Sequence, residues 1–169
     1  RTGWGVLAVE GSRLSHVGHG VLISDRKLPL AERLRQLYQA LGDVLSQWQP
    51  VEAAVEETFV NKNPSSTLKL GQARGVLLLA PAMAGIPVSE YTPNLIKKSV
   101  VGTGHAQKAQ VAMMVTTLLP AAGNVTDDAA DALAVAICHA HLRRNQQIMA
   151  QVAKNEEKAG PNRRQGVGP

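Results

Sequence analysis

The chain has 169 residues, of which 44% are hydrophobic and 18% charged, and its net charge is +5 at pH 7. This length suits one globular domain with a full core, and no apolar run reaches the roughly 18 residues of a membrane-spanning helix, so we expect no membrane contact. The single cysteine, Cys138, excludes a disulfide framework and lies in an apolar stretch that suggests a core position; with no signal-peptide pattern at the start, this favours the cytoplasm.

Short apolar runs separated by turn residues predict four strands. They lie at residues 3–9, 14–23, 53–59 and 87–91. The turn Glu10-Gly11-Ser12 joins the first two, which are expected to pair antiparallel. Because strand side chains alternate, His16 and His19 are expected to face opposite ways.

Apolar residues at helical spacing, together with end signals, predict five helices. They lie at residues 29–48, 64–84, 93–100, 106–119 and from 126 into the 150s. The second is expected to start at the cap Asn63 with Pro64 in its first turn, and its apolar run at 76–80 suggests burial on most sides. Strands followed by helices in this order indicate an α/β fold with a sheet covered on both faces.

The last residues differ in composition from the rest of the chain. From residue 154 onward the sequence is polar and rich in Gly and Pro, and it includes Arg163 and Arg164. Such a segment buries too little apolar surface to fold. We therefore expect one domain at residues 1–153 and a basic disordered tail at 154–169.

Positive charge is concentrated in the middle of the chain. Residues 60–115 contain one acid, Glu90, and six basic residues, namely Lys62, Lys69, Arg74, Lys97, Lys98 and Lys108. One-sided positive charge is typical of a surface that binds phosphate backbones. The alternative is an ordinary solvated face of lysines and arginines.

Two carboxylates, Asp128 and Asp131, stand three residues apart in a run of mostly small apolar residues. On a helix this spacing puts both on one face, where they repel each other and lose solvation. A divalent cation such as Mg²⁺ would remove both penalties, because it binds carboxylate oxygens and keeps positions open for water and phosphate. The alternative is a helix start in which Thr126 or Asp127 is the cap and the acids complement the helix dipole.

A third carboxylate, Glu56, lies within a predicted strand beside Glu57. Neighbouring strand residues point to opposite faces, so one of the two must face a covered side of the sheet unless the strand lies at an edge with both acids solvated. A strand acid combined with two late helix acids is a common way to build a metal site for phosphoryl transfer, in which two cations activate water and stabilise the leaving oxygen.

Four segments carry a family resemblance that covers Thr2 to about His141. They are V-E-E-T-F at 55–59, K-N-P-S-S-T-L-K-L-G-Q-A-R-G at 62–75, I-K-K-S-V-V-G at 96–102 and D-A-A-D-A-L-A at 128–134. In this order and spacing they resemble the RuvC Holliday junction resolvases, which are nucleases of the RNase H-like fold. The resemblance implies a mixed sheet flanked by helices on both faces.

The resemblance also implies an activity. A homodimer would grip a four-way DNA junction and make paired, symmetric, metal-dependent nicks during recombination and repair. The cofactor would be Mg²⁺, with Mn²⁺ possible and two ions per active site, and the RuvA–RuvB branch-migration complex would be a partner.

Residue by residue, the resemblance implies that Glu56, Asp128 and Asp131 are catalytic metal ligands. Lys97 and Lys108 match basic residues that act near the scissile phosphate, for which an ordinary surface position is the alternative. Phe59 matches an aromatic residue that stacks on bases at the crossover, and a core position is its main rival. The remaining expected DNA contacts are Lys62, Lys69, Arg74 and Lys98.

One departure from the family pattern concerns the first catalytic carboxylate. In the family it lies in a D-P-G motif at the end of the first strand, a few residues before T-G-W-G, whereas here Arg1 directly precedes Thr2-Gly3-Trp4-Gly5. We expect that the chain is a fragment of a longer protein whose first strand is missing. The alternatives are a junction-binding relative without catalytic activity and an RNase H-like nuclease with a different substrate.

Overall fold

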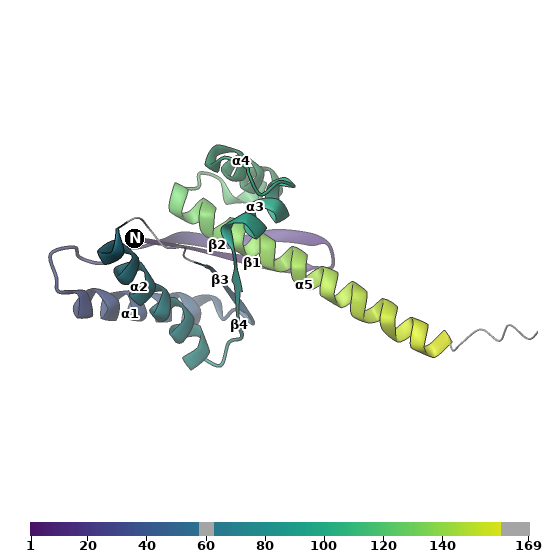
Figure 1. The fold of residues 1–169 in the computed structure, drawn as a ribbon, viewed down its shortest axis with the longest axis horizontal. Helices are drawn as coiled ribbons and strands as arrows, with labels where there is room; N and C mark the ends of the chain where they lie inside the picture. Colours follow the sequence, from purple (N-terminus) through teal and green to yellow (C-terminus); the bar gives the residue numbers. More distant parts are fainter. Residues whose placement is uncertain (58–62, 160–169) are drawn as a thin grey trace, which may run out of the picture.

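The computed structural model describes residues 1–57 and 63–159 (Figure 1). Within them, the strands are β1 (Thr2–Glu10), β2 (Arg13–Leu22), β3 (Ala53–Glu56) and β4 (Val88–Tyr91). The helices are α1 (Leu30–Trp48), α2 (Pro64–Met83), α3 (Pro93–Val101), α4 (Lys108–Leu118) and α5 (Asp127–Ala159), with a short 3-10 turn η1 (Pro120–Ala122). The predicted α/β class is confirmed, with each element close to its predicted place.

Helix ends follow the local sequence signals. The Asn63 side chain accepts hydrogen bonds from the backbone N–H groups of Ser65 at 3.0 Å and Ser66 at 3.3 Å, which caps α2 as predicted. Thr92 caps α3 in the same way. Gly102 ends α3 with a φ of 90°, a left-handed conformation that glycine adopts without strain.

The strands form two small sheets where one was expected. β1 pairs antiparallel with β2, and β3 pairs parallel with β4. In the part of the chain that the structure describes, β1 does not pair with β3. α5 packs on the strands from one side, while α1 and α2 lie on the other (Figure 1). Helices therefore cover both faces of the strand layer, but no hydrogen bonds join the β1–β2 pair to the β3–β4 pair within the described residues.

The expectation for the two histidines of β2 was wrong. His16 Nε2 and His19 Nδ1 lie 2.8 Å apart. The register shifts between Val6, which faces Gly18, and Leu7, which faces His16, so that Val17 is an extra residue in β2. This β-bulge breaks the alternation of side chains and brings the two rings together.

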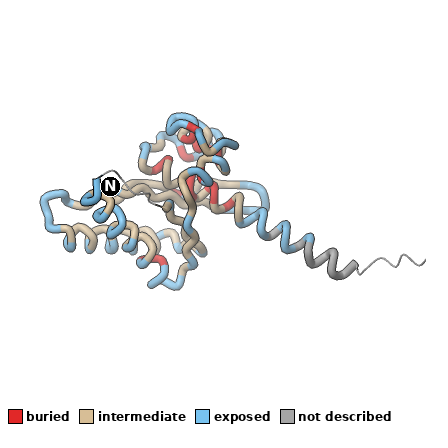
Figure 2. The backbone as a smooth tube through the Cα atoms, in the orientation of Figure 1, coloured by how far each residue is buried: buried red, intermediate tan, exposed pale blue. Residues whose placement is uncertain are grey.

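The buried core lies where the first half of α5 meets α3 and α4 (Figure 2). Leu133, Ile137 and Cys138 of α5 are fully buried, as are Val115 of α4 and Leu119 after it. Burial of each large apolar side chain contributes about 1.5–3 kcal/mol to folding. The core position predicted for Cys138 is confirmed.

The outer side of α2 does not match the prediction of burial on most sides. Of its described residues only Ala80 and Pro81 are buried, and Leu79 is 53% exposed. α2 packs on α1 and on the β3–β4 pair, which leaves its remaining side without a cover from the described residues. Its apolar residues are therefore available for an interaction outside this chain.

α5 continues to Ala159, in agreement with a last helix that runs into the 150s. Residues 154–159 are therefore helical rather than irregular chain, and residues 160–169, with Arg163 and Arg164, lie outside the described residues. The described helices contain none that is both long enough and apolar enough to cross a membrane.

Candidate active site

The two aspartates of α5 lie at its first turns, directly against β1. A Cβ atom added to Gly3 would lie 1.7 Å from the backbone oxygen of Asp128, and one added to Gly5 would meet the Leu133 side chain at 2.6 Å. Only glycine allows the strand to approach the helix this closely. The T-G-W-G segment therefore fixes the start of α5, and with it Asp128 and Asp131.

Glu56 is brought to the same place from β3. It is the last residue of that strand and pairs in register with Tyr91 of β4. Its side chain is open to water, yet the surrounding protein limits its solvation. The pKa of Glu56 is raised, first by this partial burial and then by the charge of Asp131, and Lys97 and Lys108 counteract part of the rise. Glu56 and Asp131 thus interact electrostatically across the space between β3 and α5.

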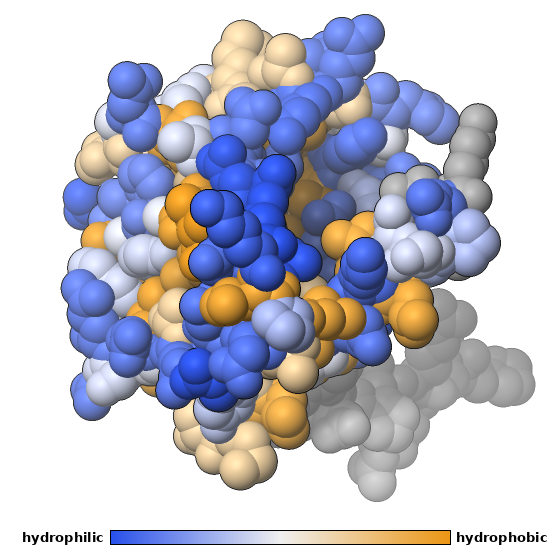
Figure 3. Space-filling view, turned by 90° about the vertical axis from the view of Figure 1, so that its left-hand side faces the viewer, coloured by the Kyte–Doolittle hydropathy of each residue, from blue (hydrophilic) through white to orange (hydrophobic). Residues whose placement is uncertain are grey.

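A cleft of about 920 Å³ contains all three carboxylates. Residues 2–9 of β1 and all of β3 line it, and α5 contributes Asp128, Asp131 and His139 among other residues. Figure 3 shows strongly hydrophilic side chains gathered beside a hollow on the N-terminal side of the molecule. The cleft is therefore lined both by apolar strand residues and by the three acids.

Basic side chains neutralise the two aspartates. Arg1 Nε lies 3.0 Å from Asp128 Oδ2, and Lys108 Nζ lies 3.1 Å from Asp131 Oδ2 and 3.5 Å from Asp127 Oδ2. The hydrogen bond to Asp131 is the main reason that the pKa of Lys108 is raised. Positive charge is thus held directly against both aspartate side chains that the sequence analysis expected to bind a cation.

The donor set fits a hard divalent cation, although its geometry is not that of a closed site. Within residues 1–57 and 63–159, no three Asp, Glu, His or Cys side chains converge closely enough to hold a metal ion. Asp128 and Asp131 turn toward Arg1 and Lys108 instead. Carboxylate oxygens are nevertheless the ligands that Mg²⁺ and Mn²⁺ prefer.

The expected DNA contacts are spread over several elements. Lys69 on α2 and Lys98 on α3 are exposed, and Lys97 is half-buried near Glu56. Arg74 forms an ion pair with Glu90 of β4, so its charge is already compensated. Phe59 and Lys62 lie outside the described residues.

Two features of the site were not expected from the sequence: the position of Arg1 and a polar network behind Glu56. Arg1 is the residue next to T-G-W-G, and its pairing with Asp128 follows from the packing of β1 on α5. The network joins Tyr91, His139, Glu52 and Arg143. The sequence signal for it was His139, a polar residue inside an otherwise apolar helix segment.

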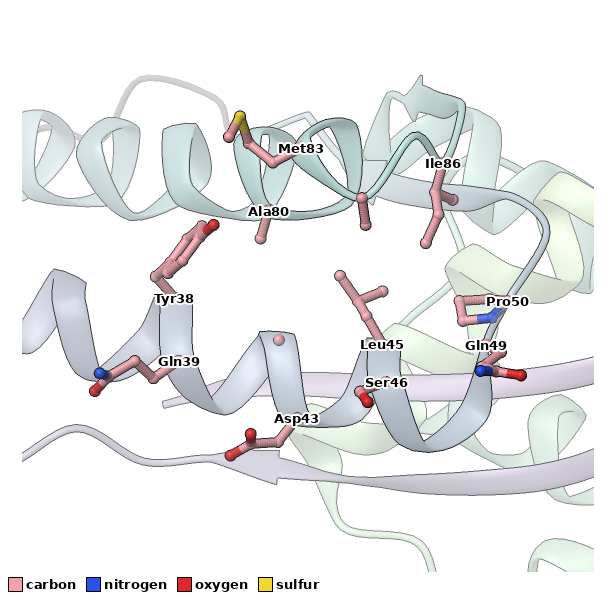
Figure 4. A pocket seen from close by; sticks show the side chains of 12 residues that line it. Tyr38, Gln39, Asp43, Leu45, Ser46, Gln49, Pro50, Ala80, Met83 and Ile86 are labelled. Carbon is pink, nitrogen blue, oxygen red and sulfur yellow. The ribbon is translucent and has the colours of Figure 1, made fainter.

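A second cavity, of about 910 Å³, lies between α1 and α2 (Figure 4). Tyr38 and Leu45 of α1 point across it toward α2, whose Ala80 points back toward them, and Met83 also lines it. It contains one carboxylate, Asp43, and none of the residues expected to bind a metal or DNA. The chemistry therefore points to the cleft between β1 and β3.

Comparison with known proteins identifies a family for this chain. The family model described as "Crossover junction endodeoxyribonuclease RuvC" matches residues 1–139. The protein of that name from Rhodospirillum rubrum is 63% identical to this chain over 142 residues, which cover 84% of each chain. The one from Paramagnetospirillum magneticum is 60% identical over 149 residues, which cover 88% of this chain and 90% of the relative. The structure "T. thermophilus RuvC in complex with Holliday junction substrate" superposes with a TM-score of 0.77 at 34% identity, and covers 84% of this chain and 87% of that one. This chain belongs to the RuvC family of crossover junction endodeoxyribonucleases, whose solved members share its fold.

Proposed function

We propose that this protein is a metal-dependent endodeoxyribonuclease that resolves four-way DNA junctions by paired, symmetric nicks. The proposal rests on one observation: Glu56 of β3 and Asp131 of α5 interact electrostatically and line the same cleft as Asp128. Lys97 and Lys108 lie close enough to act on the charge of Glu56. Carboxylates from two distant parts of the chain, surrounded by positive charge, suit the cleavage of a phosphodiester. The role in recombination and repair, and the location in the cytoplasm, are parts of the same proposal.

Glu56, Asp128 and Asp131 would hold the cation, which we propose to be Mg²⁺, with Mn²⁺ able to replace it and two ions in each active site. Divalent cations lower the pKa of water and stabilise charge on a leaving oxygen. The mixed charge of the cleft supports this assignment. Lys97 and Lys108 place ammonium groups beside the acids, so a DNA phosphate that enters the cleft meets compensating charge.

DNA capture is assigned to the basic residues near this cleft. Lys69 and Lys98 are exposed and free to approach the phosphate backbone, as phosphate contacts require. Arg74 would have to exchange its partner Glu90 for a phosphate. We also propose Lys62 as a backbone contact and Phe59 as the residue that stacks on bases at the opened crossover, in the manner of aromatic contacts to single strands.

Symmetric nicking requires two active sites, and we propose that a homodimer supplies them. α2 carries Leu68, Leu79 and Met83 along one stripe of its surface, and they are 65%, 53% and 70% exposed. Exposed apolar stripes of this kind mark protein interfaces, and a second copy of the chain would cover this one. The RuvA–RuvB branch-migration complex is proposed as a further partner on the family resemblance alone.

A second candidate function is junction binding without cleavage. It is favoured by the ion pairs of Asp128 with Arg1 and of Asp131 with Lys108, and by the absence of a converged set of three ligands in the described residues.

The test is cleavage of a synthetic four-way junction in Mg²⁺ or Mn²⁺. It compares the chain as printed with the same chain extended at its N-terminus by a strand-forming segment that ends in Asp-Pro-Gly. Resolvase function predicts symmetric nicks by the extended protein, and Asp128→Asn in that protein should bind the junction without cutting it. Binding without nicks by both chains at every metal concentration would favour the second candidate, and cutting at full rate by Asp128→Asn would refute the site assignment.

A further inference from the structure

The strand that carries Glu56 is only weakly held by backbone hydrogen bonds. β3 has four residues, and it pairs with β4 alone among the described elements. Its other edge faces the cleft. Side-chain contacts between the β3–β4 pair and α5 must therefore contribute to the distance between Glu56 and Asp131.

A continuous polar network provides such contacts. Tyr91 Oη lies 2.8 Å from His139 Nδ1, and His139 Nε2 lies 2.9 Å from Glu52 Oε2. Arg143 Nη2 lies 3.0 Å from the other oxygen of Glu52. The network links α5 to Tyr91 at the end of β4 and to Glu52 just before β3, so it holds the strand pair at both ends.

The chemistry of the side chains determines which group donates and which accepts in each hydrogen bond. A carboxylate only accepts, so His139 Nε2–H donates to Glu52, and Nδ1 of the neutral ring accepts from the Tyr91 hydroxyl. The side chains of His139 and Glu52 are 18% and 25% exposed. Little water competes at this depth, so these bonds resist displacement more than surface contacts do.

The network lies next to the carboxylates without touching them. Tyr91 is the register partner of Glu56. His139 follows Asp131 by eight residues, about 12 Å along α5 and on roughly the same side of the helix. One rigid segment of α5 therefore carries both the aspartate and the histidine that holds the opposing strand pair.

We propose that His139 is a positioning residue, which sets the distance between Glu56 and Asp131 by joining Tyr91 and Glu52 to α5. The inference rests on the proposed metal site. In this proposal His139 does not contact DNA, and it affects the metal site only through the position of Glu56. Removal of His139 should let the β3–β4 pair shift relative to α5, and the cation should then lose the contribution of Glu56.

The experiment measures Mn²⁺ binding to the full chain without DNA, by the loss of the free Mn²⁺ signal in electron paramagnetic resonance. His139→Ala should weaken binding about tenfold, as the loss of an orienting partner does at other metal sites. His139→Gln should restore most of the affinity, because its amide can donate to Glu52 and accept from Tyr91. His141→Ala is the matched control, since His141 is bonded to Ser99 of α3 and not to β3 or β4, and its affinity should equal that of the unmodified chain.

A double-mutant cycle with Glu56→Gln separates positioning from general stability. If His139 acts through Glu56, His139→Ala should change Mn²⁺ affinity less than about twofold in the Glu56→Gln background. An equal loss in both backgrounds, or no loss in either, would overturn the inference. Should His139→Ala fail to fold, Tyr91→Phe supplies the same cycle by removing a single hydroxyl. If the unmodified chain does not bind Mn²⁺, the metal site of the proposed function fails first, and the inference fails with it.

Discussion

Two halves of the molecule hold the carboxylates in different ways. Asp128 and Asp131 stand on α5, whose first half is the most buried part of the structure and packs on α3, α4 and β1. Glu56 stands at the end of a four-residue strand in the half built from α1, α2, β3 and β4, where few residues are fully buried. α5 is therefore the fixed reference of the site, and the site is complete only when the second half is held correctly against it.

We expect the largest loss of stability from substitutions in the core of the α5 half. Leu133→Ala removes a fully buried side chain, so the free energy of unfolding should fall by about 2–5 kcal/mol. Val51→Ala in the other half, where the side chain is 79% exposed, should change it by less than about 0.5 kcal/mol. Urea denaturation measures both, and equal losses would contradict the assignment of the core to α5.

The contact between β1 and α5 should be the next most sensitive feature. In Gly3→Ala the new methyl group would overlap the backbone oxygen of Asp128, so the strand or the helix must move, at a cost of about 1–3 kcal/mol. Gly42→Ala is the control, because an added Cβ meets no atom within 4 Å there. Thermal unfolding of the two variants tests this, and an unchanged melting temperature for Gly3→Ala would show that the close approach is not needed.

Much of this architecture could be predicted from the sequence because local signals encode it. Asn63 and Pro64 mark a helix start whatever surrounds them, and the spacing of Asp128 and Asp131 places both on one helix face. The shared location of Glu56 with these aspartates was expected from the family motifs, and the structure brings them to one cleft; their roles as ligands remain a prediction.

Features that depend on long-range packing could not be predicted in the same way. The bulge at Val17 that joins His16 to His19 arises from pairing with β1, which no pattern within β2 reveals. The exposure of Leu79 depends on what lies outside α2. The network through His139 joins residues that are distant in sequence, so a polar residue in an apolar helix segment indicates His139 but not its partners.

A smaller effect is expected where exposed basic residues meet DNA. Lys98→Ala should weaken junction binding and reduce the slope of log affinity against log salt by about one, because one fewer phosphate contact releases fewer counterions. Lys27→Ala, an exposed lysine before α1 and outside the basic segment, should leave the slope unchanged. Fluorescence anisotropy with a labelled junction over a range of salt concentrations measures both, and identical slopes would argue against Lys98 as a DNA contact.

The smallest expected effect is the change in protein stability that Glu56 causes when no metal is bound. The pKa of Glu56 is raised in the folded protein, so the folded state releases this proton less readily than the unfolded state does. The folded protein therefore loses stability as the pH rises from the ordinary titration range of a glutamate through the raised pKa. Glu56→Gln should therefore stabilise the protein at neutral pH in EDTA, by less than about 1 kcal/mol because the side chain is exposed and screened. The gain should vanish below the ordinary range, where both side chains are neutral, and a gain that persists there would contradict this cause.

Whether the two halves of the molecule bind one cation together can be measured in a crystal of this protein soaked in Mn²⁺, with data collected at the manganese absorption edge. We expect an anomalous peak in the cleft with carboxylate oxygens of both Glu56 and Asp131 at roughly 2.0–2.6 Å. A peak bound by the aspartates of α5 alone, with Glu56 turned away, would contradict it.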